Sequence, residues 1–354
     1  MDAEAMGSRW RRPFAVGVVR QPKNAGAADP RNARVGARQG CRRAPPKLAT
    51  CDCRIRPGPF VVMEGPAQRS GDNERTVPMA DNEATGGARP LRFGVVAPVT
   101  TDLPAWRDQV RRIADSGYST LLMPDAQQWQ PAPGPTLAVA ATLADLRVGT
   151  WVYASPLRPP WSLAWEAHSL SVLTEGRFEM GIGTGRPGIE DELRGLGLPV
   201  VTPGERLSQV RDAVTSLRDL DGPDLHTPVA MAVRGPKARA LAVDLADTVT
   251  FATKPGTSRA EIMWMAAAFR AIRDVELALH VPVVGDAVSP FMAPPDTDPA
   301  ALRAADSLLV LPDDPTAAIE EILRRREEGG FSYFVVGANA ADALAPVVAE
   351  LTGR

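Results

Sequence analysis

The segment Gly176–Gly188, GRFEMGIGTGRPG, decides between two folds that share an alternation of strands and helices. Its glycines match the G-x-G-x-x-G pattern of a dinucleotide-binding turn. That turn needs a helix to follow at once and an acidic residue about 20 positions later to end the next strand. Here a loop rich in Pro and Gly follows, and Glu205, at about that spacing from Gly185, opens a helix instead. The context therefore argues against a dinucleotide site.

The chain from Leu91 onward repeats one pattern, a short apolar strand followed by an amphipathic helix, which is typical of a parallel sheet covered by helices. The strands are predicted over Leu91–Ala97, Ser119–Asp125, Arg147–Ala154, Arg177–Gly183, Pro228–Val233, Asp247–Ala252, Glu276–Val284 and Phe331–Gly337. Eight such units match the usual length of a TIM (β/α)8 barrel, about 250 residues. A doubly wound sheet is the alternative. In a barrel, the active site lies at the carboxyl ends of the strands.

Residues 1–90 differ from the rest in composition. They carry 16 Lys and Arg against 9 Asp and Glu, whereas residues 91–354 carry 24 against 33. Rich in Arg, Pro and Gly and poor in periodic apolar residues, this extension is predicted to be disordered. Its Arg-rich run Arg31–Pro46 has no interleaved aromatic residues to stack on bases, which disfavours a nucleic-acid-binding arm.

The three cysteines, Cys41, Cys51 and Cys53, all lie in the extension, without the paired spacing or nearby His of a zinc site. No stretch is apolar for the 18 or so residues that a membrane span requires. We therefore expect a cytoplasmic protein, outside the membrane and without a catalytic metal.

Two strand ends carry groups suited to an anion. Backbone N–H groups of Gly183–Gly185 can approach a phosphate, with Arg186 to balance its charge; alternatively these glycines only allow a tight exit from the strand. After the next strand, Arg234 and Lys237 flank Pro236, which suits the first turn of a helix whose N-terminus favours anions. One cofactor tail is predicted to touch both turns.

Residues 91–354 resemble the luciferase-like monooxygenase superfamily, and within it the oxidoreductases that use the deazaflavin coenzyme F420. The segments that carry the resemblance are LRFGVV (91–96), ADSGYSTLLMPD (114–125), LRVGTWV (146–152), SLSVLTEGRFEMGIGTG (169–185), GPKARALAVDLAD (235–247) and REEGGFSYFVVG (326–337). The resemblance implies a TIM barrel, usually a homodimer, that binds a flavin-type cofactor across its strand ends. The implied cofactor-binding residues are Val152, Tyr153 and Ala154 for the ring, and Gly183, Thr184, Gly185, Arg186, Arg234, Gly235, Pro236 and Lys237 for the phosphate.

Three positions depart from the family pattern. Ala126 follows Asp125 where relatives commonly have His, Pro159-Pro160 stands where His-Pro is frequent, and Ser171 replaces a frequent Asp. The missing His leaves Asp125 as the predicted catalytic acid or base, ahead of Asp286 and, more remotely, Asp102. The alternative for all three is a solvated or capping carboxylate, the commoner role of Asp in loops.

The remaining candidates are aromatic residues and histidines. Trp129, in a Pro-rich loop, is predicted to line the substrate pocket, while Trp151 has an equal claim to outward core packing. None of the three histidines, His168, His226 and His280, is expected at the active end, so each is predicted to be structural.

The resulting hypothesis is an F420-dependent oxidoreductase that transfers a hydride to or from a small organic substrate. The alternatives are a reduced-FMN-dependent monooxygenase and a non-catalytic cofactor-binding homologue, the latter suggested by Ala126.

Overall fold

The computed structural model describes residues 89–127 and 129–354. The extension predicted over residues 1–90 lies almost wholly outside these residues, so its disorder stays a prediction. Among the described helices, none is long and apolar enough to cross a membrane.

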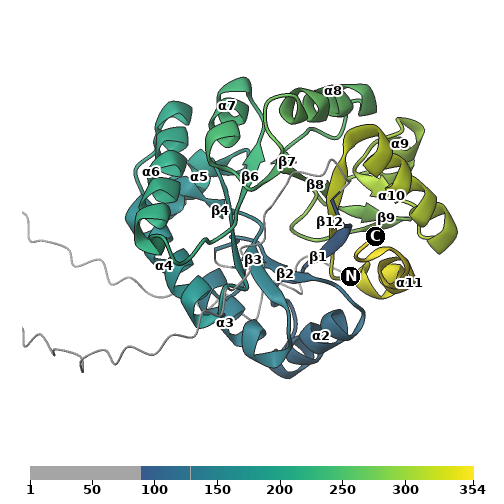
Figure 1. Cartoon of the computed structure of the whole chain (residues 1–354), viewed down its shortest axis with the longest axis horizontal. Helices are drawn as coiled ribbons and strands as arrows, with labels where there is room; N and C mark the ends of the chain where they lie inside the picture. Colours follow the sequence, from purple (N-terminus) through teal and green to yellow (C-terminus); the bar gives the residue numbers. More distant parts are fainter. Residues whose placement is uncertain (1–88, 128) are drawn as a thin grey trace, which may run out of the picture. The chain divides into compact units, whose positions relative to one another are not determined.

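Parallel strands close into an eight-stranded barrel surrounded by helices (Figure 1). The strands are β1 (Arg92–Val96), β2 (Thr120–Met123), β3 (Arg147–Thr150) with its continuation β4 (Tyr153–Ala154), β5 (Phe178–Gly183), β6 (Val229–Val233), β7 (Thr248–Phe251), β8 (Glu276–Val281) and β12 (Phe331–Gly337). β1 pairs with β12, and β3 pairs with β5, so the sheet has no free edge. The predicted TIM barrel is confirmed, and the doubly wound alternative is excluded.

The outer layer consists of helices that follow the strands in sequence. They are α2 (Leu103–Asp115), α3 (Pro133–Leu143), α4 (Pro160–Leu173), α6 (Pro203–Asp221), α7 (Pro236–Leu245), α8 (Arg259–Arg270), α10 (Pro315–Gly329) and α11 (Ala341–Leu351). Proline occupies the first turn of most of them, where its missing N–H breaks no helical bond. In α2, Trp106, Val110 and Ile113 recur at helical spacing and face the core.

One predicted strand ends earlier than expected. The seventh barrel strand, predicted over Glu276–Val284, stops at Val281 because Pro282 has no N–H to continue the ladder. The chain continues into a separate three-stranded sheet, in which β9 (Val283–Val284) pairs with β10 (Ala287–Val288) and β11 (Val310–Leu311). The short helix α9 (Pro299–Ala304) lies between β10 and β11 in sequence.

Two further details distinguish the structure from the prediction. The predicted third strand is interrupted at Trp151–Val152, whose peptide bond is cis, and the 3-10 helix η1 (Ser155–Leu157) follows β4. The loop after β5, predicted to be irregular, contains the helix α5 (Ile189–Gly195).

The amino-terminal end of the barrel is filled by ion pairs. Arg92, at the start of β1, contacts Glu276 at 2.5 Å and Glu179 at 2.7 Å, and Arg147 also contacts Glu179 at 2.6 Å. Burial opposes ionisation of Glu276, but the hydrogen bond and charge of Arg92 hold its pKa below the usual value. These strand starts are therefore a structural end, and chemistry is expected at the opposite end.

Candidate functional site

The two predicted anion-binding turns lie side by side. β5 and β6 are adjacent and parallel, with Gly183 in register with Ala232. The loop that begins at Gly183 is thus next to the turn Arg234–Lys237, at the carboxyl end of the barrel. A Cβ added to Gly183 would lie 3.5 Å from the Cβ of Ala232, so the two strand ends are in close contact.

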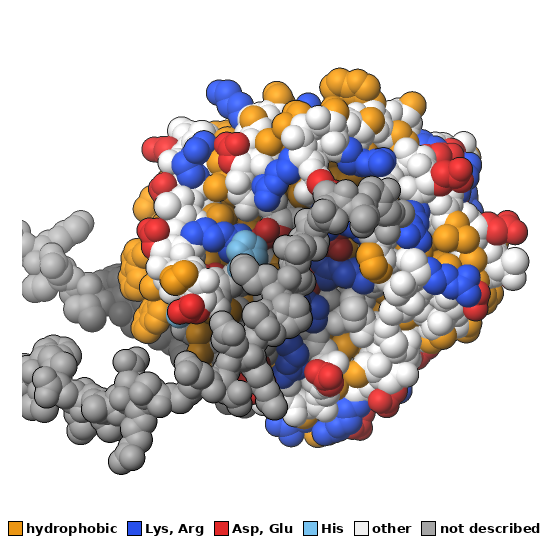
Figure 2. All heavy atoms as spheres, in the orientation of Figure 1, with side chains coloured by type: hydrophobic (Ala, Val, Ile, Leu, Met, Phe, Trp, Pro, Cys, Tyr) orange, Lys and Arg blue, Asp and Glu red, His pale blue; other side chains and the backbone are white. Residues whose placement is uncertain are grey.

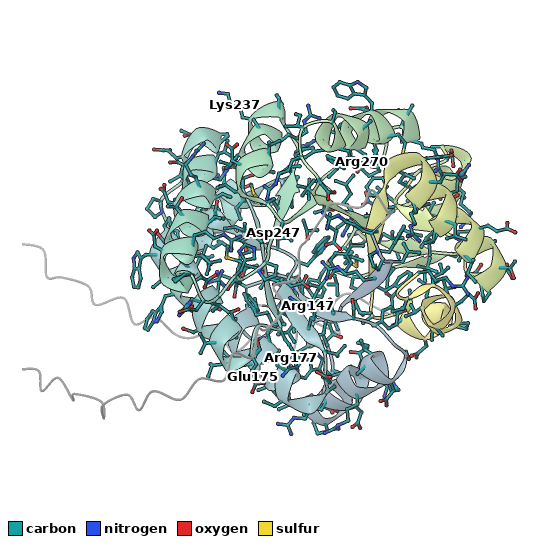
Figure 3. All side chains as sticks on the ribbon, viewed as in Figure 1. Arg147, Glu175, Arg177, Lys237, Asp247 and Arg270 are labelled. Atoms are coloured by element: carbon teal, nitrogen blue, oxygen red, sulfur yellow. The ribbon has the colours of Figure 1, made fainter. Side chains whose placement is uncertain are left out.

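The turn after β6 leaves a helix terminus without side-chain partners. Gly235 caps α7 without a side-chain hydrogen bond, and a Cβ at this glycine would meet nothing within 4 Å. Arg234 and Lys237 are exposed and make no ion pair with any described residue. Lys237 projects at the outer edge of the molecule, beside α7 (Figure 3). Free N–H groups and two unpaired cations suit a phosphate.

In contrast to the turn after β6, residues of the turn after β5 contact other parts of the protein. Gly185 has a φ of +92°, and a Cβ there would lie 2.9 Å from the Cγ1 of Ile189, so glycine is needed for the packing of α5. Arg186 forms a 2.8 Å ion pair with Glu192 of α5 and donates to the backbone oxygen of Asp125 at 3.4 Å. The predicted cation of this turn is therefore balanced by a carboxylate.

Tyr153 and Ala154, two of the residues predicted to support the ring, are fixed by hydrogen bonds to neighbouring elements. Tyr153 is fully buried, and its hydroxyl donates to Oε1 of Glu166 on α4 at 2.7 Å. Burial, reinforced by the Glu166 carboxylate, raises the pKa of Tyr153 well above its usual value. The N–H of Ala154 donates to Oδ2 of Asp125 at 3.1 Å, and Val152 is half-buried. The Tyr153 side chain thus faces the helical layer.

Asp125 is bound to Arg158. Its carboxylate accepts from Nη1 and Nη2 of Arg158 at 2.7 and 2.9 Å as well as from Ala154, and its side chain is only 1% exposed. Burial opposes the charge of Arg158, but Asp125 raises the pKa of the guanidinium above its usual value. Three donated hydrogen bonds favour a role in fixing Arg158 and β4; the catalytic role of Asp125 stays a prediction.

A small cavity of about 280 Å³ adjoins this ion pair. Its lining residues come from the end of β2, the loop that follows it, and Arg158: they are Asp125, Ala126, Gln127, Gln130, Pro131, Ala132, Pro133 and Arg158. Trp129 does not line it and is 51% exposed. The predicted pocket role of Trp129 thus finds no support in this cavity, and Arg158 and Gln130 are residues that the sequence did not single out.

Trp151 and His280 meet at the carboxyl end of the barrel. The indole Nε1 of Trp151 donates to Nδ1 of His280 at 3.0 Å, with the two rings stacked at 6.4 Å. Trp151 also packs inside the barrel against Tyr333 and its neighbours on β1, β2 and β12, so outward packing of this tryptophan is wrong. The expectation that no histidine lies at the active end is also wrong, because β8 ends at Val281.

A sequence signal for His280 existed. Glu276, Ala278 and His280 alternate along β8, and Glu276 faces the barrel interior through its contact with Arg92. Because the strand ends before Pro282, the same alternation points His280 into the barrel near its carboxyl end.

The other ionisable candidates have structural partners. His168 contacts Asp221 at 2.8 Å, His226 contacts Asp247 at 3.0 Å near the starts of β6 and β7, and Asp102 caps α2. Asp286 pairs with Arg303 at 2.8 Å in the small sheet. Within residues 89–127 and 129–354, no group of three or more His, Cys, Asp or Glu is arranged to hold a metal ion.

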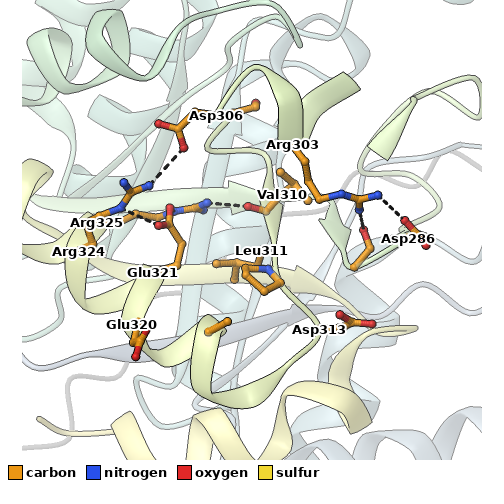
Figure 4. A pocket seen from close by; sticks show the side chains of 14 residues that line it. Asp286, Arg303, Asp306, Val310, Leu311, Asp313, Glu320, Glu321, Arg324 and Arg325 are labelled. Atoms are coloured by element: carbon orange, nitrogen blue, oxygen red, sulfur yellow. Dashed lines mark hydrogen bonds and ion pairs between the residues drawn. The ribbon is translucent and has the colours of Figure 1, made fainter. Parts of the chain in front are cut away.

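A larger cavity, of about 550 Å³, lies between the small sheet and α10 (Figure 4). None of its lining residues belongs to the turns after β5 and β6. Arg303 and Asp286, Arg324 and Asp306, and Arg325 and Glu321 pair across or beside it. Arg303–Asp286 ties α9 to the turn between β9 and β10, and Arg324–Asp306 ties α10 to the segment after α9. Arg325 of α10 also donates to the backbone oxygen of Val310 in β11, so this cavity is lined by a structural network.

The closed parallel barrel, with its candidate site at the carboxyl ends of the strands, defines a TIM-barrel protein of the kind that carries enzymes. The sequence model of the luciferase-like monooxygenase family matches residues 86–309. The chain belongs to this family, whose members are oxidoreductases and monooxygenases.

Solved structures with the same fold use different cofactors. The chain is 18% identical to an F420-dependent secondary alcohol dehydrogenase in complex with an F420–acetone adduct, with a TM-score of 0.57 over 74% of this chain and 99% of that one. A coenzyme F420-dependent tetrahydromethanopterin reductase from Methanopyrus kandleri is 14% identical, with a TM-score of 0.55 over 74% and 100%. A riboflavin lyase with modified FMN is also 14% identical, with a TM-score of 0.57 over 74% and 91%. No curated protein sequence matches at a significant level.

Proposed function

We propose that the protein is an F420-dependent oxidoreductase that transfers a hydride between the deazaflavin and a small organic substrate. The observation that carries this proposal is the pair of adjacent turns after β5 and β6, in which Arg234 and Lys237 flank a helix terminus whose cap residue, Gly235, makes no side-chain hydrogen bond. Such a terminus, with two cations that form no ion pair with the described residues, fits a phosphate-bearing cofactor.

The donor set fits such a cofactor in a defined way. Arg234–Lys237 and the N–H groups of Gly183–Gly185 would hold the phosphate, and the backbone at Val152–Ala154 would support the ring. The bound deazaflavin would supply the hydride chemistry, so the protein needs few reactive side chains of its own. The residues of this chain would bind, orient and shield: Asp125 and Arg158 fix the β4 backbone, and Trp151 closes the barrel interior.

The position of Lys237 favours F420 over FMN. F420 continues beyond its phosphate into an acidic glutamate tail, whereas FMN ends at its phosphate. An unpaired Lys at the outer edge of the molecule suits a tail that runs outward from the strand ends (Figure 3). A reduced-FMN-dependent monooxygenase remains the second candidate, since the phosphate-binding equipment would serve FMN as well.

Titration of the purified protein with F420 and with FMN, followed by cofactor fluorescence, tests the proposal. We expect F420 to bind and the double variant Arg234→Ala/Lys237→Ala to bind it at least tenfold more weakly, since a hydrogen bond to a charged group contributes about 1.5–3 kcal/mol. Arg107→Ala, an exposed arginine on α2, is the matched control and should leave the affinity unchanged.

Each other outcome has a distinct meaning. Binding of neither cofactor would sink the proposal. Binding of FMN alone, with oxygen-dependent turnover fed by NADH and a flavin reductase, would establish the monooxygenase. Tight F420 binding without turnover over a broad panel of alcohols, aldehydes and ketones would indicate the non-catalytic homologue.

A further inference from the structure

His280 has both ring nitrogens engaged, which defines its protonation state. Nδ1 receives the indole N–H of Trp151 at 3.0 Å, and Nε2 lies 2.8 Å from the backbone oxygen of Met292. The indole can only donate and the carbonyl can only accept. The imidazole is therefore neutral, with its proton on Nε2.

Among the residues that the structure describes, those that contact this ring are uncharged. Its two hydrogen-bond partners are uncharged, and its neighbour across the β8–β12 ladder is Val335. Tyr333, which packs edge-on against Trp151, has its pKa raised by burial and stays neutral, and Glu276 on the same face of β8 is held by Arg92 at the other end of the strand. Burial lowers the pKa of His280 below its usual 6.5, although the Met292 oxygen opposes this.

Trp151 occupies a position from which its orientation affects the candidate cofactor site. It directly precedes Val152, the first residue predicted to support the ring, and it is half-buried among side chains of β1, β2 and β12. A change in the indole orientation would therefore move the backbone that follows it.

We propose that His280 is a positioning residue that holds the Trp151 indole at the mouth of the barrel, and that protonation of His280 releases the indole and weakens cofactor binding. The released state follows from geometry, because protonated Nδ1 becomes a donor facing the indole donor. The part that concerns the cofactor rests on the proposed function; the His280–Trp151 pairing itself does not.

The pairing is tested without any cofactor by long-range ¹⁵N NMR of the histidine rings, since the chain contains only 3 His. We expect the histidine whose signals vanish in His280→Gln to be in the Nε2–H form and to titrate below pH 6.5. The signals of His226, whose side chain is 60% exposed, are removed by the control His226→Gln. An Nδ1–H tautomer for His280, or a pKa at or above 6.5, would overturn the proposal.

The functional consequence is tested by F420 affinity as a function of pH. We expect the affinity of the native protein to fall about fivefold as pH drops through the His280 pKa, the size expected for one lost neutral hydrogen bond. His226→Gln should keep this step. His280→Gln should lose it, and so should Trp151→Phe, which retains an aromatic ring but has no N–H to donate.

The two ideas fail in different ways. If F420 does not bind at any pH but NMR shows the Nε2–H tautomer and the Trp fluorescence changes with the His280 titration, the pairing stands and the proposed function falls. If F420 binds and the pH step persists unchanged in both His280→Gln and Trp151→Phe, the positioning role is wrong.

Discussion

Individual glycines of β5 are required by close packing against the strand that precedes them around the barrel. A Cβ at Gly181 would lie 1.9 Å from the backbone oxygen of Thr150, and one at Gly183 would lie 3.2 Å from Cγ2 of Val152. Real side chains do not tolerate the first of these distances, and the second requires Val152 to shift. Gly183, which is predicted to approach an anion, thus also lets β5 pack against Val152, and Gly181 lets it pack against Thr150.

This packing predicts that Gly181→Ala destabilises the protein by about 3 kcal/mol, because the added methyl meets backbone that cannot move aside. Urea unfolding measures the free-energy difference. Gly195→Ala is the control: a Cβ there meets nothing within 4 Å, so it should be neutral or stabilise α5 by up to about 1 kcal/mol. Equal stability of native and Gly181→Ala proteins would contradict this account.

At the scale of elements, α3 and α4 present an unusual outer face. α3 contains no charged residue, and the one carboxylate of α4, Glu166, points inward to Tyr153. Trp161 and Trp165 stack on each other at 6.3 Å and are 61% and 60% exposed. Two such helices without outward charge form an apolar surface of the kind that marks an interface.

The family resemblance implies a homodimer, and we propose that this face is the contact between its two copies. A two-fold interface uses the same surface patch on both copies, so a patch without charge avoids like-charge repulsion near the axis. We expect light scattering to give twice the 37.7 kDa chain mass, and Trp161→Glu/Trp165→Glu to give a single chain. Trp264→Glu, at an equally exposed tryptophan on α8, should remain dimeric. A monomeric native protein would contradict the proposal.

Site residues could be predicted where the end of a strand or the start of a helix has a local sequence signal. The helix after β6 begins at Pro236 as predicted, because proline at the first turn is a local signal. The prediction placed His280 in the middle of its strand because the apolar residues after Pro282 suggested that the strand continues to Val284. In the structure β8 ends at Val281, so His280 lies near its carboxyl end. The interruption at Trp151–Val152 also has no local signal: the run Arg147–Ala154 is as apolar as any continuous strand.

At the scale of the whole molecule, charge pairs join segments that are distant in sequence. On the face shown in Figure 2, basic and acidic side chains are interspersed. Glu321 contacts Arg259 of α8 at 2.7 Å and Arg325 at 2.5 Å, and Arg325 in turn donates to the backbone oxygens of Leu308 and Val310. Glu321 thus joins α8 to α10, and through Arg325 it is connected to the segment that leads into β11.

This network predicts a loss of stability in acid. Burial opposes ionisation of Glu321, but Arg325, Arg259 and Arg324 together lower its pKa from 4.5 to about 2. Because the folded-state pKa is depressed, the stabilisation is complete above pH 4.5 and is lost as pH falls toward 2. Glu321→Gln should lower the free energy of unfolding at pH 7 by about 3 kcal/mol, since it leaves the buried Arg325 unpaired.

Thermal unfolding of native and Glu321→Gln proteins between pH 7 and 2 measures this effect. The difference between them should shrink as pH falls below 4.5. Glu320→Gln, at the exposed neighbour on the same helix, is the control and should follow the native curve. A constant difference over the whole range would contradict the assigned role of Glu321.

The sequence alone determined the alternation of eight strands and helices, the family and the two glycine- and proline-marked turns, because these depend on local periodicity and on residues with restricted backbones. Only the tertiary structure decided that Trp151 and His280, 129 residues apart, share a hydrogen bond, and that Asp125 holds Arg158. Those contacts depend on the register of neighbouring strands and on closure of the barrel. Both are set by the packing of the whole sheet, and no single segment contains them.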